Sequence, residues 1–304
     1  MPSTTRASTR TPLLLSIAGL LLVPGAALAQ SPVPASPDAC VAGEVGALDH
    51  KTGCTDVVLR MYSWGGFVPL EYNLTDVPTF TVYGDNTAIF RPQPADGMFP
   101  NPGQPMTPLI KAVLSSAQVD ALLNYALGPG GLSTAPDEVL NPLVADAPTT
   151  VFQIDGAGVT RQVSAQALGM EDPTLPDQEA RAQLFALSDL LDSFEEQVEA
   201  GNVESADLFQ PAAYRGMLTE VWEGATDPIV PWPWADVTLE DFLAPEGNIA
   251  RYAELTPEQL AAVTPVPSGG ITTIRLQAPD DSQWYFSARP LLPDESFLPE
   301  GVTV

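Results

Sequence analysis

The feature that most constrains the fold is a set of three hairpin turns spread along the chain. Each turn is rich in Gly, Pro, Asn or Asp and lies between two short β-prone segments, a pattern that reverses the chain between antiparallel strands. The turns are Gly84-Asp85-Asn86, Asp155–Gly158 and Pro279–Asp281. They predict strand pairs over 80–83 and 87–90, over 149–154 and 159–163, and over 271–276 and 283–287.

Amphipathic helices are predicted between these hairpins. Ser115 and Gln118 are spaced as a capping box, and Gly128-Pro129 ends the helical pattern that follows them. The longest helix is predicted over 177–198, where one apolar stripe faces the core: Leu184, Leu187, Leu191, Phe194 and Val198. Thr256 and Gln259 form a second capping box, with Pro257 at the first helical position. Antiparallel strands and hairpins packed with two or three amphipathic helices indicate an α+β fold.

The order of helix and hairpin recurs in the last third of the chain. The segment TTVFQIDGAGVTRQVSAQAL (149–168) has the same length as TTIRLQAPDDSQWYFSARPL (272–291), and both begin with Thr-Thr and end with Leu. We therefore expect an α+β region over 40–205 and a smaller one over 206–304 that packs on the first. Two related halves explain the recurrence, and chance similarity between short hairpins explains it nearly as well.

The start of the chain has the three parts of a secretory signal. Arg6 and Arg10 precede a short apolar run, and Ala27-Leu28-Ala29 is a cleavage site. We expect residues 1–29 to be removed after Ala29 and residues 30–39, rich in Pro and Ser, to be a flexible leader; the alternative is an uncleaved anchor. No later apolar run is long enough to span a bilayer, so the sequence predicts a secreted protein without membrane insertion.

The charge of the chain excludes one class of partner. The formal net charge is −26, and removal of the signal with its two arginines takes it to −28. Such a surface repels phosphate backbones and anionic lipid, so no nucleic-acid partner is expected. It could attract a basic protein or a cation, or serve only to keep an exported protein soluble.

The chain has two cysteines, Cys40 and Cys54, close together near the expected mature N-terminus. In an oxidising compartment such a pair is most simply a disulfide, and closing a loop of this size contributes about 3 kcal/mol in the chain-entropy description. A zinc site would need two further ligands, and the single histidine, His50, lies inside the same loop.

Most familiar catalytic machinery is excluded by composition. One histidine and two lysines leave little room for a Ser-His-Asp arrangement, a histidine-rich metal site or a Schiff base, and no phosphate-binding or dinucleotide motif occurs. No catalytic, cofactor-binding or metal-binding residue is therefore predicted. Paired carboxylates are the remaining option for catalysis. Neighbouring acidic residues occur at Glu195-Glu196, Glu220 with Glu223, and Asp280-Asp281.

Two aromatic clusters are candidate contact surfaces for a partner. The first contains Trp64, Gly65, Gly66 and Phe67 at the end of a strand predicted over 57–64, and the second contains Trp232 and Trp234 between prolines. Aromatic residues beside Gly and Pro can anchor a protein partner or a sugar ring. The alternative is that both clusters belong to the core. A nearby Asn-Leu-Thr sequence, 73–75, fits a glycosylation acceptor.

The segments VVLRMYSWGGFVP (57–69), FTVYGDNTAIF (80–90), ADAPTTVFQI (145–154) and ARPLLPDE (288–295) resemble a group of secreted proteins from actinobacteria and similar bacteria. That resemblance covers most of the mature chain and implies no known activity. In layout only, residues 57–198 are also similar to emfourin-type inhibitors of metalloproteases. The shared features are a strand ending in Gly-Gly-Phe, a second strand, a capped helix, a hairpin and a last helix.

Two functional hypotheses follow, from different classes. The first is a secreted, non-enzymatic binding module, such as a protease inhibitor, whose partner is an extracellular protein or glycan. The second is a carboxylate-based extracellular hydrolase that acts on a glycan or another polymer. The convergence of acidic side chains in a cleft, or its absence, is the structural observation that separates them.

Overall fold

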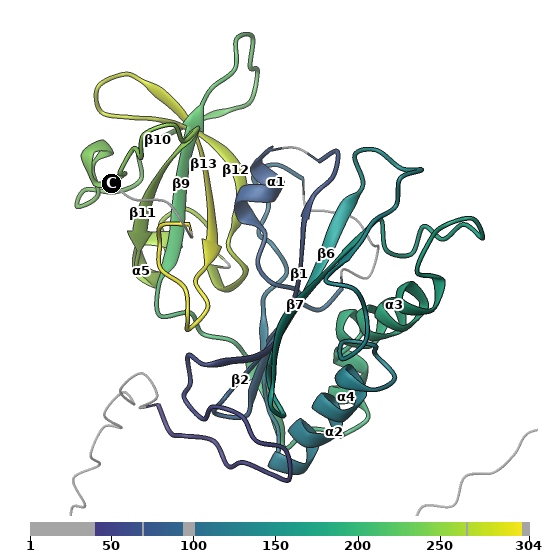
Figure 1. Ribbon diagram of the computed structural model, residues 1–304. Helices are drawn as coiled ribbons and strands as arrows, with labels where there is room; N and C mark the ends of the chain where they lie inside the picture. Colours follow the sequence, from purple (N-terminus) through teal and green to yellow (C-terminus); the bar gives the residue numbers. More distant parts are fainter. Residues whose placement is uncertain (1–39, 69, 94–100, 266, 300–304) are drawn as a thin grey trace, which may run out of the picture. The chain divides into compact units, whose positions relative to one another are not determined.

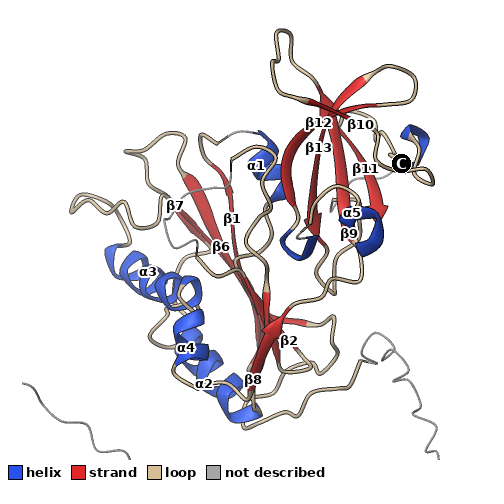
Figure 2. Ribbon diagram, turned by 180° about the vertical axis from the view of Figure 1, so that it is seen from behind, coloured by secondary structure: helices blue, strands red, loops and turns tan. Residues whose placement is uncertain are grey.

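The computed structural model describes residues 40–68, 70–93, 101–265 and 267–299, which belong to one unit of the chain (Figure 1). The predicted signal (1–29) and leader (30–39) lie outside the described residues. Antiparallel strands and helices together confirm the α+β class (Figure 2). Cys40 and Cys54 form the predicted disulfide, with their Cα atoms 5.7 Å apart.

The larger sheet has eight strands in the order β5-β7-β6-β1-β2-β3-β4-β8. Every neighbouring pair is antiparallel except β5 with β7. Two of the three predicted hairpins, β2–β3 and β6–β7, are confirmed here. The strands are β1 (Val57–Gly65), β2 (Phe80–Tyr83), β3 (Thr87–Phe90), β4 (Ile110–Val113), β5 (Glu138–Val139), β6 (Pro148–Gly156), β7 (Val159–Gln166) and β8 (Ser205–Leu208).

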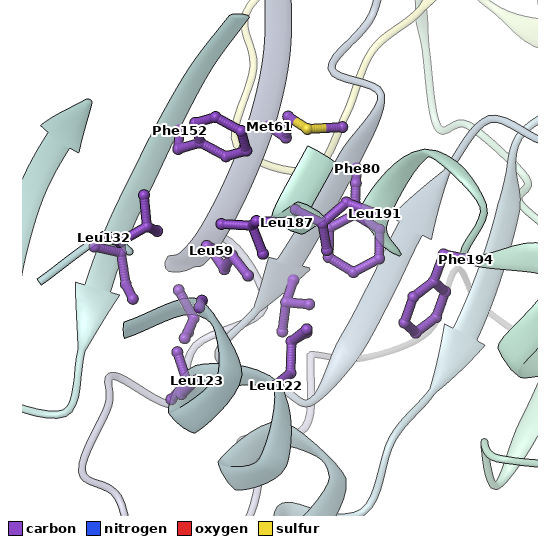
Figure 3. Packing of buried hydrophobic residues seen from close by; sticks show 14 of the residues in the cluster. Leu59, Met61, Phe80, Leu122, Leu123, Leu132, Phe152, Leu187, Leu191 and Phe194 are labelled. Atoms are coloured by element: carbon purple, nitrogen blue, oxygen red, sulfur yellow. The ribbon is translucent and has the colours of Figure 1, made fainter. Parts of the chain in front are cut away.

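Three helices cover one face of this sheet: α2 (Ser116–Leu127), α3 (Gln178–Asp192) and α4 (Glu195–Glu199) (Figures 1 and 2). The predicted capping box of Ser115 and Gln118 is present at the start of α2. Leucine side chains from α2 and α3 pack against Leu59, Met61 and Phe152 of the sheet to form the main core (Figure 3). The alternation of β1 and β6 thus directs one set of side chains into this core.

The prediction of one long helix over 177–198 was wrong, because the chain breaks between α3 and α4. Ser193 ends α3 because its backbone angles, φ −101° and ψ 26°, depart from helical values, and its hydroxyl donates to the Asp189 carbonyl. Phe194 then turns its ring toward the sheet, where its centroid lies 4.7 Å from that of Phe80 and 5.3 Å from that of Phe90. The apolar stripe is kept while the helix is interrupted.

The smaller sheet has five strands in the order β10-β12-β13-β9-β11, antiparallel except for β10 with β12. It contains the third predicted hairpin, β12–β13, and one face is covered by Trp234, Phe242 and Leu260. The predicted capping box at Thr256 starts α5. The elements are β9 (Tyr214–Glu220), β10 (Ile229–Pro231), η1 (Leu239–Asp241), β11 (Ala250–Leu255), α5 (Pro257–Ala261), η2 (Pro267–Gly269), β12 (Ile271–Gln277) and β13 (Gln283–Pro290).

The second face of the smaller sheet carries the short helix α1 (Leu70–Thr75), which follows β1 in sequence. Leu74 of α1 packs with Met217 and Tyr252 of this sheet, and α1 lies against β12 and β13 (Figure 1). A segment from the first half of the chain therefore lies on the sheet built from the last third. α1 and the smaller sheet together line the apolar concavity at the candidate site.

The larger sheet ends with β8 at Leu208 and the smaller sheet begins with β9 at Tyr214, while the domain boundary at 205/206 stays a prediction. The two similar hairpins are connected differently, however. In the larger sheet the first strand of the hairpin, β6, pairs with the central strand β1. In the smaller sheet the second strand of the hairpin, β13, pairs with β9. This difference in strand order gives no support to the two halves being repeats.

Candidate functional site

The first aromatic cluster forms a turn at the end of β1, which we call the aromatic turn (Trp64–Val68). Gly65 and Gly66 have φ angles of 77° and 84°, in the left-handed region that glycine adopts without strain. A Cβ on Gly66 would also meet the backbone nitrogen of Pro148 at 3.2 Å. The Phe67 N–H donates to the Asp146 carbonyl at 3.0 Å, which ties the turn to the chain leading into β6. The turn is therefore held in place by its backbone.

The two aromatic side chains of this turn are exposed. Phe67 is 94% exposed and Trp64 is 60% exposed, although each has a large apolar ring. The sequence is compatible with rings that face the core and with rings that face the solvent. In the structure both are available to a partner, and each lines a different concavity.

The first concavity, which we call the apolar groove, has a volume of about 760 Å³. Its walls come from four separate parts of the chain: the aromatic turn, α1, the loop before β4, and the smaller sheet with its β9–β10 connection. Four aromatic residues contribute to the lining: Phe67, Tyr72, Trp222 and Tyr285. A concavity of this size and character is typical of ligand-binding sites.

Side-chain contacts fix the β9–β10 wall of the apolar groove. The Tyr285 hydroxyl donates to Asp227 at 2.8 Å, and the ring of Trp222 lies 4.4 Å from that of Tyr285. Arg275 donates to the Ala225 carbonyl at 2.9 Å and to the Gln283 side chain at 2.6 Å. Arg275 therefore holds this connection against the sheet, and the groove is preformed.

The second concavity, which we call the polar hollow, lies beside Trp64 and has a volume of about 540 Å³. Arg60, Tyr62 and Trp64 alternate along β1 and line it together with Gln153 of the neighbouring β6. Asn73, Asp76 and Glu295 complete its polar rim. In contrast to the groove, this surface combines one exposed aromatic ring with amide and carboxylate groups.

The charged groups of the polar hollow are paired, with one exception. Arg60 contacts Asp294 at 2.6 Å, and Arg289 contacts both oxygens of Glu295, at 2.7 and 2.9 Å. Burial raises the pKa of Asp76 to about 6, against the opposing effect of the Arg91 guanidinium. Asp76 therefore changes its charge near pH 6.

The second predicted cluster does not join the first. Trp234 is 7% exposed, and its ring lies 5.2 Å from those of Trp232 and Phe286. The two indole N–H groups donate to the carbonyls of Val237 and Gln259, each at 2.7 Å. Both rings cover the face of the smaller sheet opposite α1, because apolar strands there need a cover. We therefore leave Trp232 and Trp234 out of the site.

The acidic residues singled out from the sequence lie on separate elements and do not meet. Glu195 on α4 accepts from the Gln93 N–H, and Asp280 and Asp281 close the β12–β13 turn by bonds to Ser282 and Gln277. Sequence reasoning missed Asp76, Trp222, Asp227 and Tyr285. Only the folded chain brings these residues to the two concavities.

No group of three or more metal-ligating side chains forms among the described residues, and none of their helices is long and apolar enough to cross a membrane. No protein-family model, curated protein or solved structure matches this chain. Function therefore has to be argued from the geometry of the site.

Proposed function

We propose that this chain is an exported, non-enzymatic binding module that contacts an extracellular protein through Phe67 of the aromatic turn and the apolar groove. The observation that carries the proposal is the 94% exposure of Phe67, which stands on an anchored backbone beside the groove. Exposed apolar groups that continue into a concave surface mark interaction sites. The disulfide is in keeping with an oxidising compartment.

The groove supplies the chemistry that a protein partner needs. Trp222 is 56% exposed and Val230 is 41% exposed, so the apolar surface continues from Phe67 along the β9–β10 connection. Aromatic anchors in preformed pockets contribute most of the binding energy in protein interfaces. Because Arg275 and Tyr285 already fix this wall, little conformational entropy is lost on binding.

The form of binding that we propose is protease inhibition. An inhibitor presents a rigid, exposed segment to an enzyme cleft, and the aromatic turn has these two properties. The order of elements also supports inhibition, because it is similar to the layout of emfourin-type metalloprotease inhibitors. The similar elements are β1 with Gly-Gly-Phe at its end, β2, α2, the β6–β7 hairpin and α3. The acidic charge of the chain favours an enzyme with a basic surface.

A carboxylate-based hydrolase is less well supported. Asp76 and Glu295 line the same hollow, as a pair of catalytic carboxylates would. Both oxygens of Glu295, however, accept hydrogen bonds from Arg289, and one also accepts from the Leu292 N–H. Glu295 therefore has a structural role that leaves Asp76 without a second reactive carboxylate.

The test measures inhibition constants of the purified protein against a panel of secreted metalloproteases and serine proteases. We expect inhibition of at least one enzyme and a loss of about tenfold or more in Phe67→Ala, since a buried aromatic anchor contributes 2 kcal/mol or more. The matched control is Phe185→Ala, which removes a ring that is 46% exposed on α3, away from the groove. Equal inhibition by Phe67→Ala and the unchanged protein would rule out the proposed contact surface. Inhibition of no enzyme would rule out the inhibitor class.

A further inference from the structure

We propose that the polar hollow is a second binding site, which takes a neutral saccharide with Trp64 as its stacking platform. The hollow and the apolar groove share no lining residue, so this site does not depend on the protein contact proposed above. Its lining residues come from β1, β6, the segment around α1 and the chain after β13.

A pyranose ring has two kinds of surface, and the hollow offers a partner for each. The C–H groups on the faces of the ring are apolar and pack against an aromatic ring, and Trp64 presents an indole that is 60% exposed. The hydroxyl groups around the edge of the sugar need hydrogen-bond donors and acceptors. Asn73, Gln153 and Asp76 provide both beside the indole.

Two polar side chains that line the hollow, Gln153 and Arg60, are held in place before any ligand binds. The Gln153 amide donates to the Gln162 side chain at 3.0 Å across the β6–β7 pair, which fixes the orientation of the amide. Arg60 donates to Thr81 on β2 at 3.1 Å as well as to Asp294. Trp64 follows Tyr62 on the same side of β1, and both line the hollow. A preorganised polar rim around one exposed ring is suited to a rigid, hydroxyl-rich ligand.

The distribution of charge selects a neutral sugar over an acidic one. The guanidinium group of Arg60, which lines the hollow, is already in an ion pair with Asp294, and Arg289 is paired with Glu295 of the rim. No lysine lines the hollow, so the described residues leave no unpaired cation there for a carboxylate or sulfate group. The net charge of −26 repels a polyanion over longer distances. A neutral saccharide needs no cation in the hollow and is not repelled by the net charge.

The experiment is calorimetric titration of the purified protein with cellohexaose, maltohexaose and N-acetylchitohexaose, and with hexagalacturonate as the anionic comparison. We expect at least one neutral oligosaccharide to bind. Hexagalacturonate should bind weakly or not at all. Trp64→Ala should weaken that binding about tenfold or more, and Trp64→Tyr should restore part of it because an aromatic face returns. Phe185→Ala is the control, and circular dichroism checks that each variant is folded.

Failure to bind any of the three neutral oligosaccharides would overturn the inference, as would a preference for hexagalacturonate or unchanged binding by Trp64→Ala. The two proposals fail separately. Saccharide binding without protease inhibition would remove only the inhibitor class proposed for the groove, and the reverse result would remove only the saccharide site. Cleavage of the bound oligosaccharide, lost in Asp76→Asn, would support the saccharide site and overturn the non-enzymatic function.

Discussion

Asp76 directly follows α1, at the border between the helix and the polar hollow. Burial disfavours its ionised form, and the nearby Arg91 offsets only part of that effect, so its pKa lies at about 6. In the unfolded chain an aspartate has a pKa of about 4. Between these two values the folded protein binds the proton more strongly than the unfolded chain does.

This difference predicts a pH dependence of stability. Because the folded-state pKa is raised, the contribution of Asp76 to the free energy of unfolding should fall as the pH rises from about 4 to about 6, by roughly 2–3 kcal/mol in total. Asp76→Asn has no such proton and should flatten this part of the curve. Urea unfolding of both proteins at several pH values from 4 to 7 measures the difference. Parallel curves would show that Asp76 does not titrate in this range.

The candidate site was only partly predictable at the scale of residues. Both aromatic clusters combine Trp with Gly or Pro, yet Phe67 is exposed and Trp234 is buried. Both rings have Gly or Pro as sequence neighbours. They differ in whether other elements of the fold pack over them. Trp234 lies over apolar strands of the smaller sheet, whereas no described element lies over Phe67. Local sequence carries no information on that cover.

Elements whose causes are local were predicted correctly. The hairpin turns and the capping boxes each depend on residues within a few positions of one another, and they are present as expected. β9 was not predicted, because its buried run includes Arg215 and Gly216, which are unusual in strands. Arg215 donates to the Phe297 and Ser296 carbonyls, and a Cβ on Gly216 would meet Leu255 at 2.7 Å. These reasons come from distant parts of the chain.

The capping box of α2 allows a prediction at the scale of one helix. The Ser115 hydroxyl accepts from the Gln118 N–H at 3.3 Å, while the Gln118 side chain accepts from the Ser115 N–H at 2.7 Å. Ser115→Ala should lower the free energy of unfolding by about 1 kcal/mol, because the Gln118 N–H loses its side-chain acceptor and keeps only the Ser115 carbonyl, 3.0 Å away. Ser116→Ala, inside the first turn, should change it by less than about 0.5 kcal/mol. Equal effects in denaturant unfolding would contradict the role of the box.

At the scale of the whole molecule, the last segment of the chain connects back to the first strands. Asp294 accepts from Arg60 on β1 at 2.6 Å and from the Tyr83 hydroxyl on β2 at 2.7 Å. Burial acts to raise the pKa of Asp294, but its bonds to Arg60 and Tyr83 outweigh it and hold the pKa below its usual range. The side chains of Arg60 and Asp294 are 13% and 18% exposed, so this pair is largely shielded from water.

Asp294→Asn should therefore destabilise the protein by about 2–3 kcal/mol at neutral pH, since it leaves the Arg60 charge with a weaker partner in a shielded place. The folded-state pKa is lowered, so this contribution is present above the ordinary aspartate pKa and is lost as the pH falls through and below it. The variant and the unchanged protein should thus converge in acid. The control, Asp207→Asn, changes an exposed residue of β8. A constant difference from pH 7 to pH 3 would contradict the ion-pair explanation.

The position of Asn73 on α1 has a practical consequence for the choice of expression host. Asn73 is exposed at the rim of the polar hollow, and it begins the Asn-Leu-Thr acceptor sequence. A eukaryotic secretory pathway that modified it would attach a branched oligosaccharide at the rim of this hollow. The attached oligosaccharide would block the hollow sterically, so even a correctly folded sample would fail to bind a saccharide there. Protein from a host without this pathway leaves the hollow open.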